Sequence, residues 1–135
     1  MQIDGILLVD GASLGNPGEG GCGVILKDME GRLIYFGGEY LGRVTNNQAE
    51  YMALIRGLEE AYRRGWKTIL VFTDSELLAR QINGNYKVRD QKLQVLYKKA
   101  KALLGRFSHW EIKHIEREEN READKLAKKA AQRKI

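Results

Sequence analysis

The sequence predicts an α/β fold in which a five-stranded mixed sheet, three antiparallel strands followed by two parallel strands, carries helices on both faces. Two observations lead to this prediction. Short apolar segments end at glycine or aspartate residues, as strands do, and the later segments alternate with stretches of helical periodicity. A strand–helix–strand order requires parallel pairing with right-handed crossovers. A length of 135 residues favours one domain over residues 1–135.

The first part of the chain predicts an antiparallel meander of three strands. Ile6–Val9 is a continuous apolar run that ends at Asp10, which is typical of a central strand covered on both faces. A glycine-rich turn, GASLGNPGEGGCG, is expected next. Val24–Leu26 and Leu33–Phe36 then flank the segment KDMEGR, whose Gly31 suits a hairpin turn.

A helix is expected to begin after Thr45. Thr45 and Gln48 have the spacing of a capping box, in which each side chain binds the other's backbone N–H. Gly65 lies where a helix stop is expected. Between these ends, apolar residues recur at helical spacing: Leu54, Ile55, Leu58, Ala61 and Tyr62.

The remainder of the chain alternates between strands and helices. Two strands are predicted, at Thr68–Thr73 and Phe107–Ile115. A short helix is expected over Ser75–Ile82, and Asp90 is expected to cap a longer one. Asn120 is predicted to cap the final helix, whose apolar side carries Ala123, Leu126, Ala127, Ala130 and Ala131.

Two aspartates stand at the ends of apolar strands. Asp10 follows the first strand and Asp74 follows the strand Thr68–Thr73. Ligands of open α/β sheets bind outside the carboxyl ends of the strands, so parallel neighbours would place these two carboxylates side by side. The alternative is that each aspartate caps a turn or helix, which is common after a strand.

Glu50 has an unusual place in its helix. It lies on the same side as Leu54 and Leu58, at steps of three and four residues, and therefore faces the sheet. A buried carboxylate is unfavourable unless it is paired, hydrogen-bonded or bound to metal. The alternative to a functional role is a salt bridge to a core arginine, although no buried basic partner is evident in the sequence.

A fourth acid, Asp124, lies near the start of the final helix, at the border of its apolar side. Alone, it is an ordinary favourable charge near the positive end of a helix. Together with the other three acids, it offers the hard oxygen ligands that suit Mg²⁺ or Mn²⁺. Two such cations roughly 4 Å apart would support in-line phosphoryl displacement.

The charge distribution favours a polyanionic partner. The net charge is +5 and the sequence pI is near 9.3. One segment holds seven basic residues against the single acid Asp90: Lys87, Arg89, Lys92, Lys98, Lys99, Lys101 and Arg106. This stripe is either a solvated helix face or a surface that follows phosphates, and the sequence leaves both interpretations open.

Other classes of protein are poorly supported. No apolar run approaches the roughly 20 residues of a membrane span, and no secretion signal is visible. The single Cys22 excludes an internal disulfide and fits a reducing compartment, so a cytoplasmic protein is expected. Nothing in the sequence requires a protein partner, and a monomer is expected. His109 and His114 lie five residues apart on a strand and cannot form a paired zinc site with one cysteine.

Four segments, in this order and at these spacings, resemble the ribonuclease H type 1 family: DGASLGNPGEGGCG, TNNQAEY, TDSELLARQINGNYKVRD and ENREADKLA. The resemblance spans essentially the whole chain and implies the ribonuclease H-like fold. It carries the family's four carboxylates onto Asp10, Glu50, Asp74 and Asp124. It further implies two Mg²⁺ ions, with Asp10 bridging both, and hydrolysis of the RNA strand of an RNA–DNA hybrid to leave 5′-phosphate and 3′-hydroxyl ends.

The resemblance also implies substrate contacts. The backbone around Gly11 and Ser13, together with Asn16 and Asn47, is similar to the family's surface for RNA, which is recognised through 2′-hydroxyls. Two further residues, Thr45 and Asn46, are similar to its pocket for a DNA-strand phosphate, where exposed N–H groups at a helix start also bind the anion.

Three departures from the family pattern affect these expectations. Many members carry glutamine where this chain has Glu76, whose charge would weaken or retune RNA contacts. Many also carry a histidine before the last acid, whereas this chain has EREEN, in which Arg117 would steady phosphate charge or Glu118 or Glu119 would handle protons. The segment Asn83–Leu93 is too short for the extra basic helix of some members, and the basic stripe is expected to compensate in part.

Two other functions compete with a hybrid-specific nuclease. One is a binding module that has lost activity on the same fold, although all four acids are present. The other is a relative such as a junction resolvase or transposase nuclease, which the segment TNNQAEY disfavours because those proteins lack it.

Overall fold

The computed structural model describes residues 2–133 and contains the predicted mixed sheet. Its strands lie in the order β3-β2-β1-β4-β5. The first three pair antiparallel, and β1, β4 and β5 pair parallel, which confirms the predicted topology. Their bounds are β1 Gly5–Ser13, β2 Gly18–Lys27, β3 Leu33–Val44, β4 Thr68–Thr73 and β5 His109–His114.

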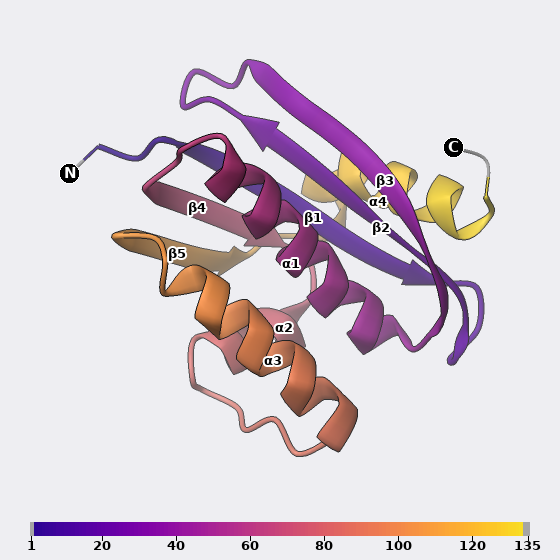
Figure 1. The fold of residues 1–135 in the computed structure, drawn as a ribbon. Helices are drawn as coiled ribbons and strands as arrows, with labels where there is room; N and C mark the ends of the chain where they lie inside the picture. Colours follow the sequence, from indigo (N-terminus) through magenta and orange to yellow (C-terminus); the bar gives the residue numbers. More distant parts are fainter. Residues whose placement is uncertain (1, 134–135) are drawn as a thin grey trace.

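Helices cover both faces of the sheet, as predicted. Figure 1 shows α1 and α3 in front of the sheet and α4 behind it, where α4 packs against β1, β2 and β3. Over residues 2–133, no helix has the length and apolar character needed to cross a membrane. The helices are α1 Asn46–Arg63, α2 Glu76–Ile82, α3 Gln91–Leu104 and α4 Arg121–Ala131, with a short 3-10 helix, η1, at Arg117–Asn120.

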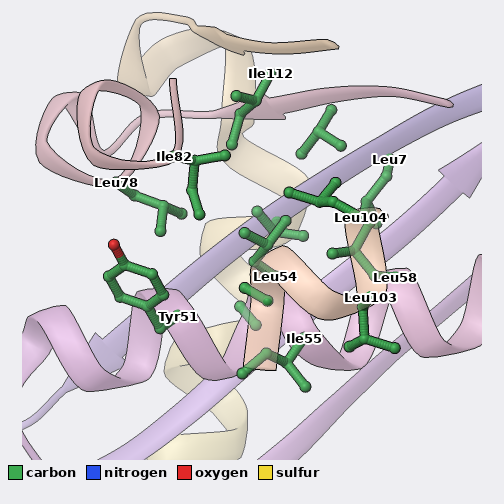
Figure 2. Packing of buried hydrophobic residues seen from close by; sticks show 14 of the residues in the cluster. Leu7, Tyr51, Leu54, Ile55, Leu58, Leu78, Ile82, Leu103, Leu104 and Ile112 are labelled. Atoms are coloured by element: carbon green, nitrogen blue, oxygen red, sulfur yellow. The ribbon is translucent and has the colours of Figure 1, made fainter. Parts of the chain in front are cut away.

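The apolar stripe of α1 fixes the helix against the sheet. Leu54 and Leu58 are fully buried, and Figure 2 shows them gathered with Leu7 of β1 and Leu104 of α3. Burial of each such side chain stabilises the fold by about 1.5–3 kcal/mol. Tyr62, which the pattern also placed on this stripe, is instead 45% exposed at its edge. Because the stripe sets the rotation of α1, it also sets the direction of the other residues on that side.

The predicted helix ends are observed in detail. Thr45 Oγ1 accepts the Gln48 N–H at 3.1 Å, and Gln48 Oε1 accepts the Thr45 N–H at 2.9 Å, which completes the capping box. Gly65 follows α1 with a φ of +85°, a left-handed conformation that favours glycine. The Asp90 carboxylate accepts the Leu93 N–H at 2.9 Å and caps α3.

The strand bounds were predicted too short in the glycine-rich region. β2 was expected to begin at Val24 but begins at Gly18, so most of the predicted glycine-rich turn is strand. The glycines serve helix packing: a Cβ built at Gly21 would lie 2.3 Å from the Ala131 nitrogen, and one at Gly23 would lie 2.3 Å from the Ala123 oxygen. Residues without side chains therefore let α4 rest directly on β2.

This close approach predicts the effect of adding one methyl group. Gly23→Ala is expected to lower the free energy of unfolding by about 1–3 kcal/mol, because the backbone of α4 must move away from β2. Gly105→Ala is the matched control, since its Cβ would meet only Ala102 and Lys101 oxygens at 3.4–3.5 Å in helical backbone. Urea unfolding of both variants measures the difference. Equal stability of the two variants would contradict the packing role.

Candidate active site

Three carboxylates meet at the carboxyl end of the central strands. One oxygen from each of Asp10, Glu50 and Asp74 lies within 4.8 Å of the others. The register explains the first pair: Val9 and Thr73 form the last parallel pair of β1 and β4, and the two aspartates directly follow them. Asp10 itself continues in β1, which runs past the expected end to pair with β2. The structure thus places Asp10 and Asp74 side by side, as the strand pattern predicts.

Glu50 is carried to the same point by α1. Its Oε1 accepts the Gly11 N–H at 2.8 Å. A Cβ at Gly11 would lie 2.3 Å from the Ala49 carbonyl carbon and 2.4 Å from the Glu50 nitrogen, so the missing side chain allows α1 to touch β1 here. Among the described residues Glu50 forms no ion pair within 4.0 Å, and the alternative of a core arginine partner is therefore wrong.

Asp124 approaches the group from the opposite face of the sheet. It stands in the first turn of α4, close enough to Asp10 for its charge to raise the pKa of that carboxyl. Within residues 2–133, however, Asp124 does not belong to the group of three that meets within 4.8 Å. Its Oδ2 instead lies 3.1 Å from Lys128 Nζ. The fourth carboxylate is therefore adjacent to the other three but already paired with a cation of the chain.

Burial and the repulsion of neighbouring carboxylates hold protons on Asp10 and Glu50. Burial, followed by the charges of Glu50 and Asp74, raises the pKa of Asp10 from 3.8 to about 10. Burial and the charge of Asp74 likewise raise the pKa of Glu50 from 4.5 to about 8, although the Gly11 N–H and the Arg117 guanidinium oppose that rise. Near neutral pH, the positive groups of the chain therefore do not balance the negative charge that these carboxylates would carry.

Asn120 is a site residue that the sequence analysis missed. It occupies the N-cap position of α4 but makes no capping hydrogen bond, so its predicted capping role is wrong. Its buried amide instead donates to the Val9 oxygen at 2.9 Å and to Asp74 Oδ2 at 3.4 Å. Asn120 therefore links Asp74 to β1 and helps to orient its carboxylate. An asparagine before a helix predicts a cap, and no other signal in the sequence distinguishes this role.

Capping does not account for Asp74 either. Ser75 is the N-cap of α2, and its Oγ accepts the Leu78 N–H at 3.1 Å. Asp10 lies inside a strand, and Asp74 lies next to a helix that another residue caps. The alternative that each aspartate serves as a turn or helix cap is therefore wrong. The donor set is made entirely of carboxylate oxygens, which are the ligands that hard divalent cations prefer. The cluster indicates the use of divalent metal.

Three of the expected substrate residues, Ser13, Asn16 and Asn46, are joined by hydrogen bonds beside the cluster, and we call this group the linked corner. Ser13 N–H donates to Asn46 Oδ1 at 3.2 Å, and Asn46 N–H donates to Asn16 Oδ1 at 3.0 Å. These bonds tie the turn between β1 and β2 to the start of α1. Thr45 and Asn47 stand at the same helix start.

A groove of about 770 Å³ runs from this corner to the start of α3. Asn16, Thr45 and Asn47 line one side, and Arg89 and Lys92 of the basic stripe line the other. Residues of the basic stripe therefore have two roles: some line the groove, and others pack against the rest of the chain. Lys101, at its far end, lies 4.9 Å from the Trp110 ring centroid and donates to the Ile82 oxygen at 3.3 Å, which is a packing role.

The departures from the family pattern have structural consequences. Glu76 Oε2 lies 3.0 Å from Arg80 Nε, so the chain itself compensates the charge that was expected to oppose RNA. Arg117 is exposed in η1, and its charge acts on Glu50. Of the two histidines, His109 pairs with Glu111 at 3.0 Å and His114 is exposed at the end of β5.

The raised pKa values predict how stability depends on pH. Because Glu50 and Asp10 titrate higher in the native state than in the unfolded chain, the native state binds more protons between about pH 4 and about pH 8–10. The free energy of unfolding of metal-free protein is therefore expected to fall as the pH rises across this window. Asp10→Asn should flatten the profile, as measured by urea unfolding at several pH values. Superimposable profiles would contradict the electrostatic account.

Comparison with known sequences identifies the relatives of this chain. The family model described as reverse transcriptase-like matches residues 8–130. Ribonuclease HI of Halobacterium salinarum is 42% identical over 121 residues, which cover 90% of this chain and 61% of the relative, so the chain spans less than two thirds of that protein. Ribonuclease HI of Neisseria meningitidis is 35% identical over an alignment of 139 positions that covers 93% of each chain.

Comparison with solved structures agrees. RNase H1 from Halobacterium salinarum matches with a TM-score of 0.93 at 40% identity, over 96% of this chain and 98% of that one. LC11-RNase H1, isolated from compost by a metagenomic approach, was solved in complex with an RNA/DNA hybrid and matches with a TM-score of 0.92 at 36% identity, over 96% and 98% of the two chains. With its topology, its carboxylate cluster and these relatives, the chain belongs to the ribonuclease HI family.

Proposed function

We propose that this protein is a metal-dependent endoribonuclease that hydrolyses the RNA strand of RNA–DNA hybrids and leaves 5′-phosphate and 3′-hydroxyl ends. The observation that carries the proposal is the meeting of Asp10, Glu50 and Asp74 within 4.8 Å on a ribonuclease HI fold. The hybrid bound to the similar LC11-RNase H1 supports the choice of substrate.

Asp10, Glu50, Asp74 and Asp124 would hold two Mg²⁺ ions, or Mn²⁺ in their place. When bound, the ions supply Lewis acidity that activates an attacking water and stabilises the leaving oxygen. The chain prepares the ligands for this task. Glu50 is held by the Gly11 N–H and Asp74 by the Asn120 amide, so little rearrangement is needed on binding.

The RNA strand would lie on the side of the carboxylate cluster that faces the turn between β1 and β2. We assign contacts with its 2′-hydroxyls to the backbone of Gly11 and Ser13 and to the side chains of Asn16 and Asn47, which surround the linked corner. Glu76, two residues after Asp74, would contact the RNA as well, and its exposed ion pair with Arg80 would offset part of its negative charge.

The DNA strand would follow the groove of about 770 Å³ between Thr45 on one side and Arg89 and Lys92 on the other, and the RNA strand would meet Asn16 and Asn47 of the same lining. Thr45 and Asn46, at the start of α1, offer a phosphate side-chain donors and the positive end of the helix. Across the groove, Arg89 and Lys92 add mobile positive charge. This arrangement supports the expectation that the basic stripe compensates in part for the missing basic helix.

The same proposal covers the organisation of the molecule. Residues 1–135 would act as one ribonuclease H domain, monomeric, without an obligate protein partner, in the cytoplasm. One core shared by the sheet, α1, α2 and α3 supports a single domain, and the buried free Cys22 is compatible with a reducing compartment.

A cleavage assay tests the function directly. Labelled RNA–DNA hybrid, single-stranded RNA and double-stranded DNA are incubated with the protein and Mg²⁺ or Mn²⁺, and cutting is expected in the hybrid alone. Asp10→Asn should reduce cleavage at least about 1,000-fold, since it removes a ligand central to the cluster, and should retain hybrid binding. Glu30→Gln, in an exposed turn, is the control for loss of one negative charge. An intact hybrid with wild-type protein would leave an inactive binding module as the function.

Arg117 is proposed to steady negative charge on the scissile phosphate in place of the missing histidine. Arg117→Ala is expected to lower kcat about tenfold at saturating Mg²⁺, which equals a loss of about 1.4 kcal/mol. Arg121→Ala, the exposed arginine one turn further on, is the control. Unchanged turnover in Arg117→Ala would reject this role and leave Glu118 or Glu119, of which Glu119 already accepts the Glu116 N–H at 3.3 Å.

A further inference from the structure

The four carboxylates of the site are not equally compensated. Among residues 2–133, Asp10, Glu50 and Asp74 have no lysine or arginine nitrogen within 4.0 Å. Asp124 has one, because Lys128 Nζ lies 3.1 Å from its Oδ2. Lys128 follows Asp124 by four residues on α4, the spacing at which an acid and a base pair along a helix.

An ammonium group at this distance competes with a metal for the Asp124 carboxylate. A divalent cation binds a carboxylate oxygen at about 2.0–2.2 Å, so the metal and the Lys128 ammonium cannot approach Asp124 Oδ2 from the same side. Their like charges also repel. A cation that binds Asp124 Oδ2 would therefore displace Lys128, and one that binds Oδ1 would still be repelled by its charge.

Displacement is structurally simple. The Lys128 side chain is 55% exposed and the Asp124 side chain is 19% exposed, so the lysine can swing outward without disturbing the core. A groove of about 600 Å³ runs along α4 beside the pair and offers room for the released ammonium group. The ion pair is a partly screened surface interaction of modest strength, which a divalent cation can break.

We propose that Lys128 is an internal competitor for divalent cation at Asp124 and makes the two cation positions fill in order. The group of three carboxylates, with no cation of its own, fills first. The position that includes Asp124 fills only at higher cation concentration, once Lys128 has been expelled. The inference rests on the proposed function, in which Asp124 is a metal ligand.

Calorimetric titration with Mn²⁺, in the absence of substrate, tests the competition. Lys128→Gln is expected to tighten the weaker of two binding steps about two- to fivefold, the effect of removing one exposed charge from the site. Lys129→Gln is the matched control. It removes the same charge from the next residue of α4, which is exposed and belongs to none of the ion pairs of residues 2–133. Lys128→Arg should bind Mn²⁺ as the wild type does.

A second readout follows hybrid cleavage against Mg²⁺ concentration. The half-saturating Mg²⁺ concentration is expected to fall about two- to fivefold in Lys128→Gln and to stay unchanged in Lys129→Gln. If both variants shift equally, or if Lys128→Gln binds no tighter than wild type, the competition is refuted while the proposed function stands. If wild-type protein neither binds Mn²⁺ nor cuts the hybrid, the proposed function itself fails.

Discussion

The structure depends on one electrostatic constraint: three acidic side chains are forced together at the carboxyl end of β1 and β4. Carboxylates this close repel one another, and their partial burial removes the water that would screen them. In the absence of other positive charge, Asp10 and Glu50 retain protons that exposed acids would release. Such a cluster in a net-basic protein indicates the use of divalent metal.

The fold maintains this arrangement through packing at some distance from the charges. The parallel register of β1 and β4 determines the positions of Asp10 and Asp74, and the buried leucines of α1 determine the direction of Glu50. Glycines allow the helices to lie directly on the sheet. Gly11 lets α1 contact β1, and Gly21 and Gly23 let α4 contact β2 on the other face. The apolar core thus stabilises an arrangement that is unfavourable on electrostatic grounds, as is common at functional sites.

Periodicity and strand ends were sufficient to predict most of this site. Asp10 and Asp74 were visible because each follows a buried strand, and Glu50 because it shares a helix side with leucines. The β2 glycines were misinterpreted as a turn, since sequence spacing does not show how closely two backbones approach. Asn120 was misinterpreted for a related reason: its amide binds Val9, 111 residues away in the chain, and no local pattern encodes that contact.

The central claim is that water, activated within the carboxylate cluster, attacks the phosphorus of the RNA strand. Hydrolysis of an RNA–DNA hybrid in H₂¹⁸O, followed by mass spectrometry of the products, tests it most directly. The account predicts heavy oxygen in the new 5′-phosphate and none at the new 3′-hydroxyl. A 2′,3′-cyclic phosphate paired with an unlabelled 5′-hydroxyl would contradict the account, because it would show attack by the RNA's own 2′-hydroxyl.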